Sequence, residues 1–311
     1  MRIVIIGNSA AGLSCLEAFR KHDKASTVTI IGQEDRRPYS RVLLPYYLRG
    51  KVPYENLFVR GEDYYDRLSA EFVKGKVIKL LSEECCVILE DGSRISYDKL
   101  LIATGSSPIK PPIPGLSGGG VHHLWTLSDV DKLAPYFLSG KRAVVLGSGF
   151  VSLQGAWAAL SRGLNVTVIE LMSRIMPKAL DDRGAEILAS LMKKAGIDLR
   201  EGTLTSSVEQ IENEEYLLHF NDGSKLTADF IIVGTGVRPN IDFLEDTGVR
   251  IDSGIVVDEQ METNVTGVYA AGDVAQVPSF AGGFPVVHAL WPTAVETGSI
   301  AGSCMALHRT A

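Results

Sequence analysis

The chain has 311 residues, enough for about two domains of ordinary size. Its 45% hydrophobic and 22% charged residues are typical of globular proteins, and its net charge of −6 without a Lys/Arg run excludes a non-specific nucleic-acid binder. No apolar run is long enough to span a membrane, and the first residues lack the layout of a signal peptide, so we expect a cytoplasmic protein.

Cysteine usage gives no sign of a metal or disulfide site. No pair has CxxC spacing, and no cysteine lies near a histidine at the spacing of metal ligands. We therefore expect reduced, structural thiols and no metal. The four cysteines are Cys15, Cys85, Cys86 and Cys304.

The N-terminal segment predicts a strand–helix–strand unit. Residues 2–6 form a short β-branched run that predicts a buried strand, which Gly7 ends. Residues 11–22 predict a helix and residues 27–31 the next strand. A glycine-led turn between the first strand and the helix is the arrangement that binds dinucleotides.

The turn itself, Gly-Asn-Ser-Ala-Ala-Gly, matches the dinucleotide fingerprint except at its third position, Ser9. Gly7 permits the tight turn and Gly12 permits close packing of helix on strand. The small Ser9 lets a pyrophosphate approach the helix N-terminus, where N–H groups are unpaired. Alone, this turn also fits an ordinary glycine-rich turn of any α/β protein. The acid that grips a ribose is Glu34 or Asp35.

Further along the chain, a strand is followed by the first of two predicted domain crossovers. Residues 97–106 predict this buried strand, which ends in a turn of small residues. The proline-rich residues 108–115 are unsuited to a helix or a central strand and predict a crossover between domains. Residues 236–240 predict a second crossover.

Between the crossovers the first pattern recurs. Residues 141–146 predict a strand, residues 150–162 a helix and residues 165–169 a strand. The turn at Gly147 follows the turn at Gly7 by 140 positions. The chain is therefore predicted to contain two nucleotide-binding units.

The second turn, Gly-Ser-Gly-Phe-Val-Ser, has Gly147 and Gly149 in place and Ser152 at the last glycine position. Glu170 ends the second strand, 21 positions after Gly149. An acid at this spacing accepts a hydrogen bond from the adenosine ribose and repels a 2′-phosphate, which favours NADH over NADPH. The alternative is a solvated glutamate at a strand end.

Residues 263–274 predict a short strand that delivers Asp273 beyond a glycine. A carboxylate there can accept hydrogen bonds from a polyol. The alternative is an acid that merely caps the strand end.

Together, these motifs resemble the pyridine nucleotide–disulfide oxidoreductase superfamily over almost the whole chain. The motifs are GNSAAG, LLIATGS, GSGFVS with its glutamate, and TNVTGVYAAGD. The resemblance implies an α/β fold of two doubly wound, three-layer dinucleotide-binding domains. It implies an FAD-binding domain of residues 1–112 plus 241–311 and an NAD(H)-binding domain of residues 113–240. Many relatives continue into a C-terminal interface domain, which we expect to be absent here, through loss or truncation.

The resemblance also implies roles for individual residues. The first turn holds the FAD pyrophosphate, Arg41 lies beside the phosphates, Val77 touches adenine and Asp273 binds the ribitol. Phe150 covers the flavin where nicotinamide stacks. The predicted FAD site comprises Gly7, Ser9, Ala10, Ala11, Gly12, Glu34, Arg41, Val77, Ala103, Thr104, Gly105, Asp273 and Trp291. The predicted NAD site comprises Gly147, Gly149, Phe150, Val151, Ser152, Glu170 and Gly236.

Trp291 and Pro292 predict the start of a helix, because proline suits the first turn. Such a helix can aim its positive end at the flavin pyrimidine and stabilise the reduced flavin. The alternative is an ordinary helix start with a core tryptophan.

Two departures from the superfamily narrow the function. Disulfide reductases and cysteine-dependent peroxidases of the superfamily carry a cysteine near Arg41, but this chain has Val42 there. Both chemistries need a thiolate beside the flavin and are not expected. Many relatives have a glutamate where this chain has Gln154, which can bond the nicotinamide amide but cannot act as a base. Hydride transfer to flavin N5 needs no base.

The sequence thus resembles the cysteine-free branch that includes NADH:rubredoxin reductases, nitrite reductase flavin domains and ferredoxin reductases. We expect an FAD-dependent oxidoreductase that takes a hydride from NADH and passes electrons to an acceptor such as rubredoxin or ferredoxin. The alternatives are an NADH oxidase or diaphorase that reduces oxygen or small molecules, and a non-enzymatic flavoprotein module.

Overall fold

The structure is a computed structural model that describes residues 1–279 and 283–307. The chain divides into two compact units. Unit 1 comprises residues 1–40, 58–107 and 238–311, and unit 2 comprises residues 41–57 and 108–237. The boundaries differ slightly from those expected at residues 112 and 240, and residues 41–57 group with unit 2 although we expected them in the first domain. The predicted domain that ends at residue 311 includes residues 280–282 and 308–311, which lie outside the described residues.

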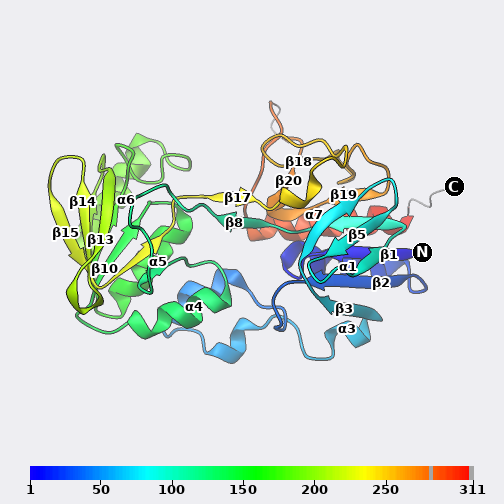
Figure 1. Cartoon of the computed structure of the whole chain (residues 1–311), viewed down its shortest axis with the longest axis horizontal. Coiled ribbons are helices and arrows are strands. Elements are labelled where there is room, and N and C mark those ends of the chain that lie inside the picture. The colour runs from blue at the N-terminus through cyan, green and yellow to red at the C-terminus, as the bar shows by residue number, and fades with distance from the viewer. Residues whose placement is uncertain (280–282, 308–311) are drawn as a thin grey trace. The chain divides into compact units, whose positions relative to one another are not determined.

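Unit 1 is built on a five-stranded parallel sheet with the order β19-β7-β1-β2-β3 (Figure 1). Its central strands are apolar, β-branched runs buried on both faces, as expected of a parallel sheet. The strands are β1 (Arg2–Ile6), β2 (Thr27–Gly32), β3 (Ala70–Lys74), β7 (Lys99–Ile102) and β19 (Val268–Ala270).

Helices α1 (Ala10–His22) and α7 (Trp291–Leu307) pack against each other, and both contribute to the core of this sheet. An antiparallel meander of three strands adds Leu80, Val87 and Leu89 to the same core. The meander consists of β4 (Val77–Leu81), β5 (Cys86–Leu89) and β6 (Arg94–Ser96). The remaining elements of unit 1 are α3 (Tyr64–Arg67), η5 (Asp242–Leu244), β18 (Ile255–Val256), η6 (Gly272–Val274) and β20 (Ala275–Gln276).

Unit 2 repeats the plan with a parallel sheet of the order β12-β11-β10-β16-β9. These strands are β9 (Val121–His122), β10 (Arg142–Leu146), β11 (Asn165–Ile169), β12 (Asp198–Arg200) and β16 (Phe230–Val233). A second, antiparallel sheet consists of β13 (Thr205–Gln210), β14 (Tyr216–Phe220) and β15 (Lys225–Ala228).

The helices of unit 2 come from two parts of the chain, residues 41–57 and residues 108–237. They are η1 (Arg41–Leu43), α2 (Leu44–Leu48), η2 (Tyr54–Leu57), α4 (Leu127–Leu133), η3 (Ala134–Tyr136), α5 (Phe150–Ser161), α6 (Asp182–Ala195) and η4 (Glu212–Glu214). Strands β8 (Ser106–Pro108) and β17 (Val237–Pro239) pair with each other. β17 lies within the predicted crossover 236–240, and β8 ends at the first residue of the predicted crossover 108–115.

The predicted strand–helix–strand units are therefore both present, with ends within one residue of those expected. In each unit, parallel strands bring their carboxyl ends to one edge of the sheet, where ligands of doubly wound folds bind. That edge carries the glycine-led turns. The predicted α/β fold class is confirmed.

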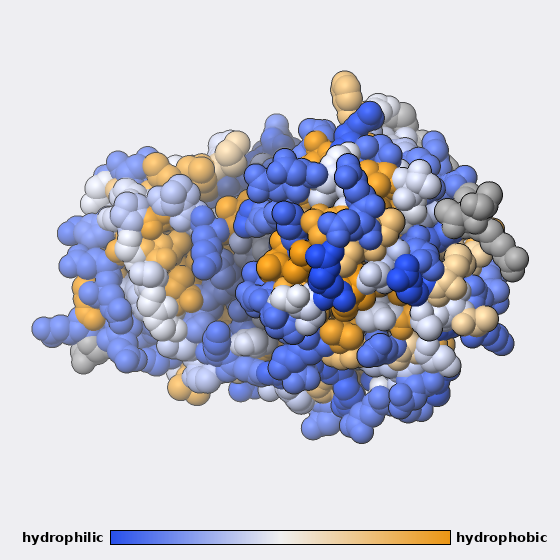
Figure 2. Space-filling model, turned by 45° about the vertical axis from the view of Figure 1, so that its right-hand side comes forward, coloured by the Kyte–Doolittle hydropathy of each residue, from blue (hydrophilic) through white to orange (hydrophobic). Residues whose placement is uncertain are grey.

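The surface is mixed in character. Figure 2 shows hydrophilic residues over most of the visible face, with groups of hydrophobic residues between them. Among the residues that the structure describes, no helix is both long and apolar enough to cross a membrane.

Candidate functional site

The turn at Gly7 is as tight as the fingerprint requires. Gly7 has a φ of +122°, and a Cβ added there would lie 2.0 Å from the carbonyl oxygen of Ala103. A Cβ on Gly12 would lie 2.0 Å from the carbonyl oxygen of Gly7. Side chains at either position are therefore excluded by backbone, and α1 lies directly against the end of β1.

The N-terminus of α1 has the donor set that a pyrophosphate needs. Ser9 is the N-cap residue with extended φ and ψ, and among the described residues its side chain makes no capping hydrogen bond. The first-turn amides, including those of Ala10 and Ala11, lack partners within the helix. Unpaired N–H groups and the positive end of the helix dipole favour an anionic group here. The geometry fits the FAD pyrophosphate that the sequence predicts at this turn.

The ends of β7 and β19 bring a second set of polar groups to the same edge. Asp273, in η6, accepts a hydrogen bond from Ser106 Oγ at 2.8 Å. Thr104 Oγ1 donates to the carbonyl oxygen of Asn240 at 2.8 Å, and Asn240 Nδ2 donates to that of Thr104 at 2.9 Å. Gly105, with a φ of +65°, has no atom within 4 Å of an added Cβ. A ligand can therefore approach the backbone at Gly105.

The two acids proposed after β2 have different surroundings. Asp35 forms an exposed ion pair with Lys74 at 3.0 Å. Glu34 is half-buried and accepts from the Tyr39 hydroxyl at 2.8 Å and 3.0 Å. Glu34 is the better-placed candidate for a ribose, because its carboxylate is held within the unit.

Helix α7 begins at Trp291, as the sequence predicted. Trp291 is half-buried and packs against the core of unit 1. The hydroxyl of Thr297, in the second turn, accepts a hydrogen bond from Gly272 N at 3.1 Å. Helix α7 is thereby tied to the residue before Asp273.

Two further predicted FAD residues are Val77 and Arg41. Val77 begins β4 and its side chain is buried in the core of unit 1. Arg41 belongs to unit 2, where its guanidinium carbon lies 5.7 Å from the ring centroid of Trp125. The roles of both residues toward FAD stay predictions.

The second turn, in unit 2, is equally constrained. Gly147 has a φ of +97°, and an added Cβ would lie 2.5 Å from the carbonyl oxygen of Gly234. Gly149 is the N-cap of α5, and an added Cβ there would have no atom within 4 Å. Ser152 is buried and its hydroxyl donates to the Gly234 carbonyl at 2.8 Å. The space in front of Gly149 fits the pyrophosphate of a dinucleotide.

The side chains around this turn face outward. Phe150 is 63% exposed, and Val151 and Gln154 are also exposed. Gly236 has a φ of +118°, and its carbonyl accepts from Ile109 N at 2.9 Å in the crossover.

Glu170 lies at the end of β11 and is buried. One carboxylate oxygen accepts from the Ser148 hydroxyl, and the other accepts from Met172 N at 2.8 Å. The glutamate is therefore a fixed acceptor and not a solvated side chain.

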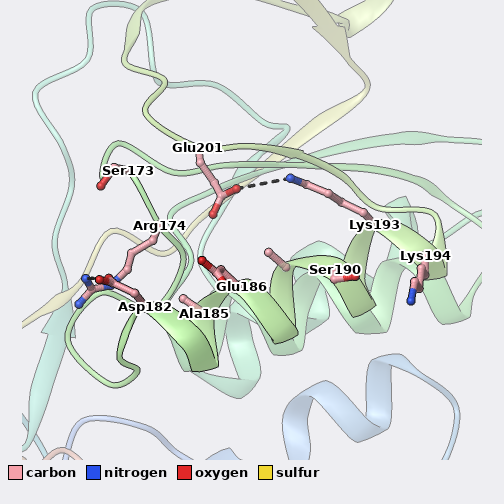
Figure 3. A pocket seen from close by; sticks show the side chains of 10 residues that line it. Ser173, Arg174, Asp182, Ala185, Glu186, Ser190, Lys193, Lys194 and Glu201 are labelled. Carbon is pink, nitrogen blue, oxygen red and sulfur yellow. Dashed lines mark hydrogen bonds and ion pairs between the residues drawn. The ribbon is translucent and has the colours of Figure 1, made fainter.

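A pocket of about 750 Å³ lies beside α6 (Figure 3). The first residue of the chain that lines it is Ser173, three positions after Glu170. Ion pairs of Arg174 with Asp182, and of Lys193 with Glu201, connect the helix to the facing segments. Lys194 and Glu186 add one charge of each sign, so positive and negative side chains are balanced around the pocket. Its lining residues are Ser173, Arg174, Asp182, Ala185, Glu186, Ala189, Ser190, Lys193, Lys194 and Glu201, and none of them is a predicted NAD contact.

Sequence reasoning did not assign Ser106, Tyr39, Asn240 or Ser148 to the sites. Ser106 and Ser148 stood inside the motifs, but a hydroxyl within a motif does not reveal its partner. Tyr39 and Asn240 carried no signal, because their contacts depend on how the loops fold.

The Cys15 thiol is buried in the core of unit 1. Burial raises the pKa of the Cys15 thiol, which disfavours the reactive thiolate. Position 42 presents an exposed valine. Within residues 1–279 and 283–307, no group of three or more His, Cys, Asp or Glu side chains is arranged to hold a metal ion.

Comparisons with known proteins agree with this picture. The model of the family described as pyridine nucleotide-disulphide oxidoreductase matches residues 1–298. The NADH-dependent phenylglyoxylate dehydrogenase subunit epsilon of Aromatoleum evansii is 34% identical over 306 residues, covering 98% of this chain and 72% of the relative. Rhodocoxin reductase of Rhodococcus erythropolis is 35% identical over 280 residues, covering 89% of this chain and 66% of the relative.

Among solved structures, the covalent complex of putidaredoxin reductase with putidaredoxin matches with a TM-score of 0.94 and 27% identity. The match covers 98% of this chain and 75% of that one.

Proposed function

Because the chain belongs to the pyridine nucleotide-disulphide oxidoreductase family, we propose that it takes a hydride from NADH into bound FAD and delivers the electrons to a small redox protein of the rubredoxin or ferredoxin type. The observation that carries the proposal is the pair of strand–helix–strand units, each with an open helix N-terminus and a fixed acid after the second strand. When bound, FAD supplies the flavin that accepts a hydride at N5 and releases electrons singly.

The residues of unit 1 are proposed to bind and orient FAD. The amides at the start of α1 hold the pyrophosphate, Glu34 binds the ribose and Asp273 binds the ribitol. Gly105 leaves room for the cofactor beside the backbone. The positive N-terminus of α7 stabilises negative charge on the reduced ring.

The residues of unit 2 are proposed to bind NADH. The amides at the start of α5 hold its pyrophosphate, and Glu170 accepts a hydrogen bond from the adenosine ribose. A buried, fixed carboxylate also repels the 2′-phosphate of NADPH. Gln154 is exposed on the first turns of α5, where it can bond the nicotinamide amide.

The acceptor is proposed to be a separate protein, because Val42 stands where thiol-dependent members of the superfamily carry a cysteine. Two relatives are by name reductases of rhodocoxin and of putidaredoxin. Both are longer than the segment matched here, so the identity of the acceptor is part of the proposal. The cytoplasm, expected from the sequence, is proposed as its location, and cell fractionation tests that point.

Anaerobic titration of the purified protein with NADH and then NADPH tests the function. We expect a flavin spectrum that near-stoichiometric NADH bleaches and NADPH bleaches poorly, followed by reoxidation on adding rubredoxin or ferredoxin. A protein that cannot be reconstituted with FAD contradicts the proposal. Fast reoxidation by oxygen alone, with no response to either redox protein, favours an oxidase. A flavin that NADH cannot reduce favours a binding module.

Substitution tests the FAD site separately. Asp273→Ala is expected to lower the FAD retained after gel filtration, because the ribitol loses its acceptor. Asp91→Ala is the control, since Asp91 lies in an exposed turn and bonds only Ser93 among the described contacts. Equal FAD content in both variants would remove Asp273 from the site.

A further inference from the structure

Ser148 occupies an unusual place within the second turn. It stands between the two glycines of Gly147-Ser148-Gly149, yet it is only 1% exposed. Its hydroxyl donates to one carboxylate oxygen of Glu170 and accepts from Met176 N at 3.0 Å. A single buried hydroxyl therefore connects the turn, the acid and the segment that follows the acid.

Glu170 is held on both sides. It is 7% exposed, and its second oxygen accepts from Met172 N at 2.8 Å. Each carboxylate oxygen has room for two hydrogen bonds, so each keeps one site for a ligand. The two protein donors fix the direction in which those sites point.

The segment after Glu170 folds back onto Ser148. Met176 has a φ of +47°, a left-handed conformation that residues with a Cβ rarely adopt. The carbonyl oxygen of Met172 accepts from Gly202 N at 2.8 Å, which attaches this segment to the end of β12. The bond from Met176 N to Ser148 closes the segment around the serine.

Unit 1 provides an internal comparison. The residue equivalent to Ser148 in the first turn is Asn8, whose side chain accepts from the Tyr65 hydroxyl. The position equivalent to Glu170 is Gly32, because Ile31 and Ile169 occupy matching registers beside the first strand of each unit. Among the residues that the structure describes, this link from the turn to an acid is found in unit 2 and not in unit 1, so it is not a general requirement of the turn.

We propose that Ser148 is a positioning residue that fixes Glu170 and residues 171–176, and thereby sets the preference for NADH over NADPH. The inference rests on the proposed function, since it concerns the ribose acceptor of the NADH site. Without the hydroxyl, the buried carboxylate loses one of its two donors and turns toward solvent. The ribose then lacks a fixed acceptor, and a 2′-phosphate no longer meets a fixed negative charge.

The test is a double-mutant cycle on nucleotide binding, which needs no turnover. Isothermal titration calorimetry gives the dissociation constants of NAD⁺ and NADP⁺ for the FAD-loaded wild type, Ser148→Ala, Glu170→Ala and the double variant. We expect Ser148→Ala to lower the preference for NAD⁺ about tenfold, the scale of a hydrogen bond to a charged group. In the Glu170→Ala background, Ser148→Ala should change the preference no further.

Two companion variants separate positioning from packing. Ser148→Cys replaces the hydroxyl by a somewhat larger group that forms only weak hydrogen bonds, and it should also lower the preference. It also keeps the test valid if Ser148→Ala fails to fold. Ser161→Ala is the matched control, because the Ser161 hydroxyl bonds the Trp157 carbonyl at the far end of α5 and should leave the preference unchanged.

The outcomes are distinguishable. A lowered preference in Glu170→Ala but not in the Ser148 variants overturns the inference and leaves the proposed function intact. Equal weakening of NAD⁺ and NADP⁺ by Ser148→Ala also overturns it, since that is the result of a loosened turn. If Glu170→Ala changes neither constant, the proposed NADH site fails together with the inference.

Discussion

Individual backbone atoms decide which glycines of the two turns are essential. At Gly7 the obstacle to a side chain is the Ala103 carbonyl, which belongs to the neighbouring strand segment. At Gly149 no atom lies within 4 Å, so the same residue type serves to leave space for a ligand. Glycine therefore has two different roles in the same fingerprint: it avoids a steric clash at Gly7 and leaves room for a ligand at Gly149. Only the neighbouring atoms show which role applies.

Gly7→Ala is predicted to abolish FAD binding and to destabilise unit 1 severely. The added methyl group would overlap the Ala103 carbonyl, and φ would remain in the left-handed region. Thermal unfolding and the flavin absorbance of the purified variant measure both effects. Gly92→Ala is the control, because Gly92 has a φ of +86° but open space around its Cβ, so it should cost only about 1 kcal/mol. Normal FAD content in Gly7→Ala would contradict the assignment.

At the scale of elements, the contact between α1 and α7 depends on two glycines spaced one turn apart. An added Cβ on Gly298 would lie 2.2 Å from the Ala11 carbonyl oxygen, and one on Gly302 would lie 2.2 Å from that of Cys15. The helices therefore touch backbone to backbone. This close approach places Thr297 where it accepts from Gly272.

Gly298→Ala is predicted to destabilise the protein by about 1–3 kcal/mol, the usual cost of overpacking. FAD affinity should fall as well, since α7 must move away from Gly272 and Asp273. Denaturant unfolding and FAD titration of the apoprotein measure the two changes. Glu296→Ala, on the exposed face of α7, should alter neither. A loss of stability with unchanged FAD affinity would show that the position of α7 does not matter to the cofactor.

Each of the two parallel sheets has an aspartate just before one of its strands that accepts a hydrogen bond from the backbone of the central strand. We call this contact an aspartate clamp. Asp98 accepts from Arg2 N at 2.7 Å before β7, and Asp229 accepts from Arg142 N at 2.6 Å before β16. Each clamp ties the entry of one strand to the central strand. For Asp229, burial alone would raise the pKa, but hydrogen bonds and charge from Arg142 outweigh it and lower the pKa.

Asp229→Asn is therefore predicted to destabilise unit 2 in a pH-dependent way. A lowered folded-state pKa means that the carboxylate contributes its full stability above the unfolded value of about 3.9 and loses it as pH falls through the folded value. The difference in unfolding temperature between wild type and variant should be largest near neutral pH and should become small at acidic pH. A difference that is constant with pH would rule out the charge as its cause.

At the scale of the whole molecule, the residues proposed for FAD lie in unit 1 except Arg41, and those proposed for NADH lie in unit 2. Residues that hold FAD should therefore leave NAD⁺ affinity largely intact, and the reverse should hold for Glu170. Ligand that binds only the folded state at about 100 times its dissociation constant adds about 2.7 kcal/mol of stability.

In thermal-shift measurements on the apoprotein, Asp273→Ala should reduce the stabilisation by FAD. Glu170→Ala should reduce the stabilisation by NAD⁺ and should leave the stabilisation by FAD unchanged. The wild type with each nucleotide gives the reference. One substitution that removed the response to both nucleotides would argue against separate sites.

Local sequence determined much of this protein. The β-branched runs, the glycine-led turns and the spacing of Glu170 predicted both strand–helix–strand units, because burial, steric freedom at glycine and helix capping act over a few residues. The recurrence after 140 positions predicted two such units, and the combined motifs predicted the family.

Tertiary structure decided which polar groups meet. The Tyr39 hydroxyl, five positions along the chain, donates to Glu34 and not to Asp35. The Ser148 hydroxyl, 22 positions away in the chain, donates to Glu170. The grouping of residues 41–57 with unit 2 likewise follows from packing and not from their place in the chain. A hydrogen bond needs its two atoms within about 3 Å. No local pattern specifies that distance, because it depends on how strands and loops distant in sequence come to lie together.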